Sequence, residues 1–82
     1  MVHDRLIKII KNYTEIPAER IRPETGLRDF GLTSFDVMNI ISDCEYEFHI
    51  VIPDHDIHTL QTVQDIVAYL TMKQNDSSGQ GS

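Results

Sequence analysis

Ser34 is the residue best placed for chemistry, because an irregular stretch gives way to a helical pattern within Gly31-Leu32-Thr33-Ser34-Phe35-Asp36. The start of a helix presents unpaired backbone N–H groups and a partial positive charge. These features favour a phosphate ester on the serine hydroxyl group. The structural alternative is that Thr33 or Ser34 only caps the helix, a common role of both residue types.

Two histidines form a second candidate group. His55 and His58 lie three residues apart, and Asp54 and Asp56 flank the first of them. These residue types bind metal ions, and such spacing places two side chains on one face of a short helix. Exposed polar residues near a helix start explain the same pattern, so we predict no metal site. A calcium loop starting at Asp54 is disfavoured, because Thr59 stands where that loop needs glycine.

A serine hydrolase with Ser34 as nucleophile and His49 as base is a third alternative. The sequence lacks the G-x-S-x-G elbow of one large hydrolase class, and 82 residues leave little room for a pocket. The single cysteine, Cys44, lies on an apolar helix face, where a buried, unreactive thiol is expected. One cysteine also excludes an internal disulfide bond and a cysteine-based zinc site.

Acidic residues dominate the middle of the chain. The sequence has 7 Lys and Arg against 13 Asp and Glu, a net charge of −6. Residues 29–72 hold eight acidic side chains and no Lys or Arg. This acidity argues against nucleic acid as a partner, since nucleic acid needs a basic face. It indicates a surface for a basic partner, with a solvated face kept charged for solubility as the alternative.

Composition is that of an ordinary globular domain, with 40% hydrophobic residues and no Trp. No apolar run reaches the roughly 18 residues that cross a bilayer. The first residues show no signal-peptide pattern. We therefore expect one domain, no membrane insertion and a location in the cytoplasm.

Apolar spacing predicts the elements that position Ser34. Residues 3–13, 34–48 and 63–72 carry apolar side chains at intervals of three and four, as amphipathic helices do. A shorter helix over about 55–60 is expected after a cap at Asp54. The predicted fold class is all-α, a small four-helix bundle of three main helices and one short helix.

The connections are less regular. Residues 14–33 form a long irregular loop between the first two helices, and a loop of this length is usually functional. Residues 50–53 predict a pinned loop, and Thr62-Val63-Gln64-Asp65 fits a capping box. We expect the folded domain to span residues 1–74. Residues 75–82 are small and polar, typical of a disordered tail or a remnant of an expression vector.

The second helix divides into faces. One arc carries its core residues: Val37, Ile40, Ile41, Cys44 and Phe48. Another arc carries Asp36, Asp43 and Glu47. Met38 lies outside the core arc, near the angular position of Ser34, and is either a partner contact or a scattered surface residue.

Four segments together resemble an acyl carrier protein. They are Phe30-Gly31-Leu32-Thr33-Ser34-Phe35-Asp36, Phe48, Ile52-Pro53-Asp54 and Thr62-Val63-Gln64-Asp65-Ile66. In that family a serine begins the second helix, which ends in Phe, and an Ile-Pro-Asp turn and a Thr-Val helix follow. The resemblance covers residues 5–72, and its specificity comes from the order, spacing and acidity of the pieces.

The resemblance implies that Ser34 accepts 4′-phosphopantetheine from coenzyme A through a phosphopantetheinyl transferase. The chain is then a non-catalytic, monomeric carrier of acyl groups held as thioesters, serving acyl-, ketoacyl- or aminoacyl-processing enzymes with basic surface patches. Partner recognition falls to seven residues: Thr33, Phe35, Asp36, Met38, Asp43, Glu45 and Glu47. Candidates for the lining of an acyl cavity, with plain core as the alternative, are Ile40, Cys44 and Ile52.

The sequence departs from the family pattern beside Ser34. Thr33 stands where the family usually has Asp, and Phe35 where it usually has Leu. These changes predict a specialised member serving a dedicated set of enzymes in fatty-acid, polyketide or related synthesis. Two alternatives remain: a peptidyl or aminoacyl carrier loaded by an adenylating ligase, and an acidic helical interaction domain without a prosthetic group.

Overall fold

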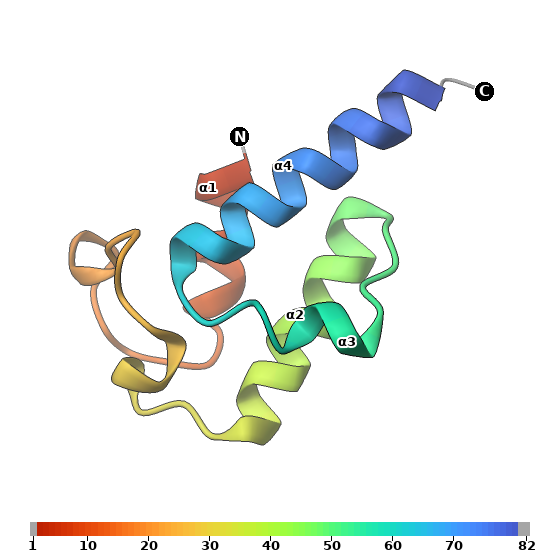
Figure 1. Cartoon of the computed structure of the whole chain (residues 1–82). Coiled ribbons are helices and arrows are strands. Elements are labelled where there is room, and N and C mark those ends of the chain that lie inside the picture. Colours follow the sequence, from red (N-terminus) through yellow and green to blue (C-terminus); the bar gives the residue numbers. More distant parts are fainter. Residues whose placement is uncertain (1, 81–82) are drawn as a thin grey trace.

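The computed structural model describes the backbone of residues 2–80 and the side chains of residues 2–74. Its α-helices are α1 (Val2–Ile10), α2 (Ser34–Phe48), α3 (Asp54–Ile57) and α4 (Val63–Gln80). Two 3₁₀ turns, η1 (Ala18–Arg20) and η2 (Leu27–Phe30), lie in the loop between α1 and α2 (Figure 1). The predicted all-α class, with three main helices and a short one, is confirmed.

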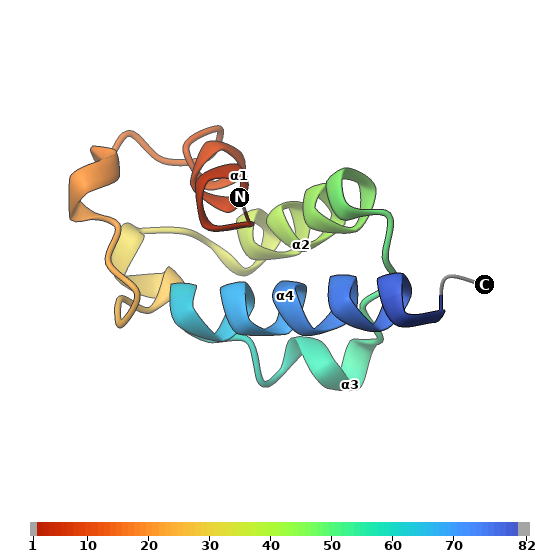
Figure 2. The same ribbon diagram turned by 90° about the horizontal axis from the view of Figure 1, so that it is seen from above.

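The helices enclose one apolar core. Helix α1 packs against both α2 and α4, and Figure 2 shows α1 and α2 on one side of α4 with α3 on the other. The most deeply buried side chains come from α1, α2 and α4: Leu6, Ile10, Ile40, Cys44, Val63, Ile66 and Leu70. The predicted core arc of α2 is buried except for Val37, which packs at the edge of the core.

Helix boundaries agree with the spacing argument for α2, which spans the predicted residues 34–48. Helix α1 ends at Ile10 rather than at 13, because the last turn tightens: Tyr13 N donates to Ile10 O over 2.9 Å. The predicted short third helix is present, but its bounds of about 55–60 and its cap at Asp54 were wrong. Helix α3 begins at Asp54 and ends at Ile57, and its N-cap is Pro53, which offers no side-chain cap.

Helix α4 starts as predicted and extends further. The capping box is confirmed: Asp65 N donates to Thr62 Oγ1 and Thr62 N donates to Asp65 Oδ2, both over 3.1 Å. The helix continues to Gln80 instead of ending near residue 72. The expected tail, residues 75–82, falls partly on this helix and partly on residues 81–82, which lie outside the described residues. Its disorder and its origin stay predictions.

The long loop is fixed at one end of the bundle (Figure 1). Four of its apolar side chains are buried: Ile21, Leu27, Phe30 and Leu32. Its backbone is also bonded to the start of α4, since Leu27 N donates to Gln61 O over 2.9 Å and Val63 N to Thr25 O over 3.1 Å. The loop therefore holds η2, and the residues that follow it, in a defined place beside α2.

The connection from α2 to α3 is the pinned loop that the sequence predicted. His49 closes α2 in the left-handed region at φ 57°, and its N–H donates to Glu45 O. Ile52 is buried, and its N–H donates to Glu45 Oε2 over 2.8 Å. Among the described residues, we find no helix whose length and apolarity would let it cross a bilayer.

Candidate functional site

Ser34 is the first residue of α2, and Thr33 is its cap. Thr33 Oγ1 accepts from Asp36 N, and Asp36 Oδ2 accepts from Thr33 N, both over 3.1 Å. Gly31 ends η2 at φ 76°, a conformation that glycine adopts without strain, and turns the chain into the helix. Because Thr33 makes the cap, the exposed hydroxyl group of Ser34 is left out of it. Of the two residues that could have served only as a helix cap, Thr33 has this role and Ser34 does not.

The nearest cationic group to this hydroxyl comes from η2. Arg28 Nη2 lies 3.4 Å from Ser34 Oγ, a long and weak hydrogen bond in which the guanidinium donates. Arg28 is itself exposed. The serine oxygen thus lies between a positive side chain and the N-terminus of α2, where the first N–H groups have no intrahelical partner. Both features suit a phosphate group on the oxygen.

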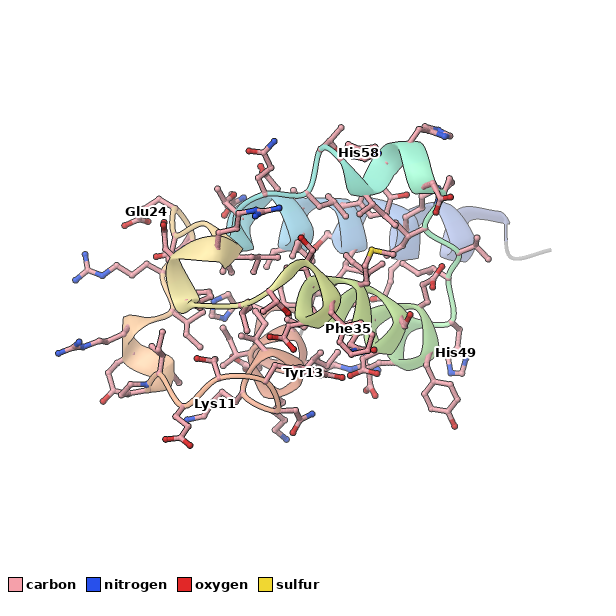
Figure 3. All side chains as sticks on the ribbon, turned by 90° about the horizontal axis from the view of Figure 1, so that it is seen from below. Lys11, Tyr13, Glu24, Phe35, His49 and His58 are labelled. Carbon is pink, nitrogen blue, oxygen red and sulfur yellow. The ribbon has the colours of Figure 1, made fainter. Side chains whose placement is uncertain are left out.

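A groove of about 690 Å³ opens beside Ser34. Its apolar wall comes from η2, α2, α3 and the segment after α3: Leu27, Val37, Met38, Ile57 and Leu60. Its polar part consists of Glu24, Gly26, Arg28, Asp29, Ser34, His58, Gln61 and Thr62. Figure 3 shows Glu24 near η2 and His58 at the end of α3, on the two sides of this region. An apolar surface within reach of a modified serine can shelter an apolar group attached to it.

The three candidates for an acyl-cavity lining, for which plain core was the alternative, do not line the groove beside Ser34. Ile40 and Cys44 have no exposed area, and Ile52 is 4% exposed. All three belong to the core cluster, and the groove beside Ser34 is lined by other residues. Burial, followed by the charges of neighbouring carboxylates, raises the pKa of the Cys44 thiol to about 12. Cys44 is thus a buried group, as its place on the apolar face predicted.

The acidic residues of α2 each have a partner within the chain. Besides the cap at Asp36, Asp43 Oδ2 accepts from the Tyr13 hydroxyl over 2.5 Å, and this hydrogen bond raises the pKa of Tyr13. Glu45 accepts from Ile52 N, as described above. The bonds of Asp43 and Glu45 tie α2 to α1 and to the following loop.

Glu47 makes the one ion pair of α2 within the described residues. Its Oε2 accepts from Arg5 Nε over 3.0 Å and from Arg5 Nη2 over 2.7 Å. The Arg5 guanidinium also lies 4.5 Å from the centre of the Phe48 ring, a cation–π contact. Both side chains are more than 40% exposed, so the pair is a surface link between α1 and the end of α2.

Two large apolar side chains lie on the surface next to Ser34. Phe35 is 75% exposed, and Met38 is 47% exposed while also lining the groove. Figure 3 shows Phe35 on α2. Thr33, Phe35, Asp36 and Met38 are thus brought together with Ser34 in the first turns of α2. Asp43, Glu45 and Glu47 lie further along the helix.

The competing sites do not assemble. Ser34 and His49 stand at opposite ends of α2, a separation of about 22 Å for 15 residues. That distance excludes a nucleophile–base pair. His55 Nε2 lies 3.3 Å from Asp56 Oδ1 of the neighbouring residue. Among the residues that the structure describes, no group of three or more potential metal-binding side chains comes together.

Comparison with known proteins decides the family. A family model described as "Phosphopantetheine attachment site" matches residues 4–70. The chain belongs to the acyl carrier protein family. It is 36% identical over 74 residues to an acyl carrier protein of Nitratidesulfovibrio vulgaris, covering 89% of this chain and 97% of that protein. A second acyl carrier protein, from Bdellovibrio bacteriovorus, is 32% identical over 73 residues, covering 88% and 94%.

Solved structures agree. An acyl carrier protein from Enterococcus faecalis superposes with a TM-score of 0.78 at 29% identity, covering 88% of this chain and 92% of that one. Another from Thermotoga maritima gives the same TM-score at 21% identity, covering 93% and 94%, which supports the fold alone. Family membership makes this chain a non-catalytic carrier with a 4′-phosphopantetheine prosthetic group. Its partners include a phosphopantetheinyl transferase and acyl-processing enzymes.

Sequence reasoning missed Arg28 and the residues of the groove from η2 and α3. One signal was present: Arg28 is the last Lys or Arg before residues 29–72 and lies six positions before Ser34. The turn that brings its guanidinium back to Ser34 follows from η2 and Gly31.

Proposed function

We propose that Ser34 is the residue to which the 4′-phosphopantetheine group is attached. The observation that carries this proposal is that Ser34 takes no part in the cap at the start of α2. Thr33 and Asp36 complete the cap, so the exposed Ser34 hydroxyl group is available to an enzyme. Arg28 and the helix N-terminus provide positive potential at the same oxygen.

In the attachment reaction, the one atom of this chain that forms a new bond is the Ser34 oxygen. The Ser34 oxygen forms a bond to phosphorus of coenzyme A, adenosine bisphosphate leaves, and the hydroxyl proton goes to a base of the transferase. Once attached, the group supplies a thiol that holds acyl chains as thioesters. This chain orients the first bonds of the arm through the fixed start of α2. The apolar part of the groove offers cover for a hydrophobic segment near Ser34.

The recognition surface we propose combines Phe35 and Met38 beside Ser34 with the carboxylates further along α2. Exposed apolar side chains supply contact area. The carboxylates steer a partner with a basic patch, which raises the association rate more than the affinity. We further propose that the carrier is a monomer, that it binds no nucleic acid, and that it works in the cytoplasm, as is typical of the family.

Thr33 and Phe35 support a specialised member of the family. Thr33 uses its hydroxyl group for the cap and adds no charge beside Ser34. Phe35 places an aromatic ring on the surface that a partner must approach. A carrier with this surface should serve a dedicated enzyme set. Complementation of a strain lacking its housekeeping fatty-acid carrier at the full growth rate would refute this proposal.

Intact mass spectrometry tests the attachment site. The apo protein is incubated with coenzyme A and a broad-specificity phosphopantetheinyl transferase, and the protein isolated from its own cells is measured in parallel. We expect the mass gain of one phosphopantetheinyl group, lost in Ser34→Ala and kept in Ser42→Ala. Ser42 is a matched control, because it is an exposed serine of the same helix.

Circular dichroism shows whether the Ser34→Ala variant is folded, which is expected because the cap does not use Ser34. A mass gain that survives in folded Ser34→Ala would place the attachment site on another residue. Absence of the gain both in vitro and in the protein from its own cells would also overturn the assignment.

A further inference from the structure

Arg28 is set apart from the other cationic residues by its surroundings. It stands at the edge of a stretch, residues 29–72, that contains no Lys or Arg. The turn η2 nevertheless directs its guanidinium to 3.4 Å from Ser34 Oγ. Among the described residues that line the groove beside Ser34, Arg28 is the one with a permanent positive charge.

The nearby carboxylates do not neutralise this guanidinium. Asp29 Oδ2 accepts from Gly26 N over 3.3 Å, and Asp36 Oδ2 accepts from Thr33 N. Glu24 lines the same groove. Within residues 2–74, Arg28 is not part of an ion pair, whereas Arg5 is. A guanidinium group has five N–H donors, so its contact with Ser34 leaves most of them available.

We propose that Arg28 is a positioning residue for the prosthetic group: its guanidinium pairs with the phosphodiester on Ser34 and holds the arm at the groove. This inference rests on the attachment site proposed above. A phosphate bonded to Ser34 Oγ brings its free oxygens to the region that Arg28 Nη2 already contacts. Arginine matches phosphate with paired hydrogen bonds, which lysine does not reproduce.

The backbone N–H groups of Ser34 and Phe35 act on the same phosphate. They are the first of α2 and lie outside its hydrogen-bond ladder. Without Arg28, the phosphate would add negative charge to a chain that already carries −6. Loss of the Arg28 side chain should therefore lower the stability of the holo protein more than that of the apo protein.

The experiment compares apo and holo forms of four proteins: wild type, Arg28→Gln, Arg28→Lys and Arg22→Gln. Arg22 is the matched control, an exposed arginine of the same loop that does not line the groove. For each protein, melting temperatures are measured before and after modification, and ³¹P NMR records the phosphodiester. Subtracting the apo value removes any purely structural effect of the substitution.

We expect the holo-minus-apo difference in Tm to be about 2–4 °C less favourable in Arg28→Gln than in wild type. Arg28→Lys should have a holo-minus-apo Tm difference between those of Arg28→Gln and wild type. Arg22→Gln should have the wild-type difference. The ³¹P chemical shift of the phosphodiester should differ from wild type in Arg28→Gln and should be unchanged in Arg22→Gln. Raising NaCl to about 1 M should shrink the wild-type advantage, because the screening length falls to about 3 Å.

Two failures are distinguishable. If no protein gains the phosphopantetheinyl mass, either in vitro or in its own cells, the attachment site itself is refuted and Arg28 with it. If the mass appears but Arg28→Gln matches wild type and Arg22→Gln in both the Tm difference and the ³¹P shift, only the role of Arg28 is overturned.

Discussion

Helix α3 forms one wall of the groove and, within the described side chains, makes one side-chain hydrogen bond to α4. It has four residues and no side-chain cap. The Tyr69 hydroxyl of α4 donates to Asp56 Oδ2 over 2.6 Å. Ile57, the next residue of α3, lines the groove. We therefore predict that Tyr69→Phe destabilises the protein through α3 while leaving the ring of residue 69 in place.

The magnitude follows from the environment of Tyr69. Burial, and then the bond to Asp56, raises the pKa of Tyr69 from 10.0 to about 12. At pH 7 the phenol is protonated, so Tyr69→Phe removes only the hydrogen bond to Asp56. Because Tyr69 is partly exposed, this bond should contribute about 1 kcal/mol. For a domain of this size, Tyr69→Phe should melt about 4–8 °C below wild type.

The pH dependence has a defined sign. A pKa raised on folding stabilises the protein below the unfolded value near 10, and this contribution disappears as pH rises toward 12. The difference between wild type and Tyr69→Phe should thus be constant from pH 7 to 9 and shrink above pH 10. Tyr13 titrates in both proteins, so its effect cancels to first order.

The assay is thermal unfolding followed by circular dichroism, with Tyr46→Phe as the matched control. Tyr46 is 85% exposed, and its hydroxyl group makes no side-chain hydrogen bond among the described residues. Tyr46→Phe should melt within about 1 °C of wild type. The reasoning is refuted if Tyr69→Phe unfolds at the wild-type temperature at pH 7, or if both variants lose the same stability.

Three further predictions concern the core, the cap of α4 and the thiol. Ile66→Ala should cost about 2–5 kcal/mol in urea unfolding, because Ile66 has no exposed area, whereas exposed Val51→Ala should cost under about 0.5 kcal/mol; equal costs would contradict the packing. Asp65→Ala should cost about 1 kcal/mol at pH 7, since backbone N–H groups, Thr62 first, lower the pKa of Asp65. This contribution is present above the unfolded pKa near 3.8, so wild type and variant should converge as pH falls below it. Cys44 should react with dithionitrobenzoate at pH 8 far more slowly in the native protein than in urea, because its pKa is raised to about 12; equal rates would show that the thiol is accessible.

The helices could be predicted from local sequence patterns, namely apolar spacing and capping residues. The bounds of α2 and the capping box of α4 follow from residues within a few positions of each other, and both are confirmed. The single-turn helix α3 was misplaced, because four residues give no period to measure. Its cap at Asp54 failed because the extended backbone of Pro53 already starts the helix there.

The groove depends on segments far apart in the sequence, which local patterns do not contain. It exists because the loop before α2 bonds to the loop before α4, through Leu27 N to Gln61 O. That contact sets η2 opposite α3 and brings Arg28 to Ser34. The core arc of α2 gave no signal for this groove, because Ile40 and Cys44 are buried in the core and the groove is lined by other residues.

The carboxylates of α2 show how one surface can be both structural and electrostatic. Asp36 and Glu45 accept from backbone N–H groups, and Asp43 accepts from the hydroxyl group of a tyrosine, so the donors in these bonds are uncharged groups. Among the residues whose side chains the structure describes, Glu47 is the one carboxylate of α2 that is paired with a cation, Arg5.

An exposed pair of this kind contributes about 0.2–1 kcal/mol. A partner's cation could therefore replace Arg5 on Glu47 at little cost, whereas displacing Asp36 or Glu45 from the backbone would undo a cap or a loop. From this ranking we predict that a basic partner contacts Asp43 and Glu47 directly. We predict that Asp36 and Glu45 act by steering from a distance.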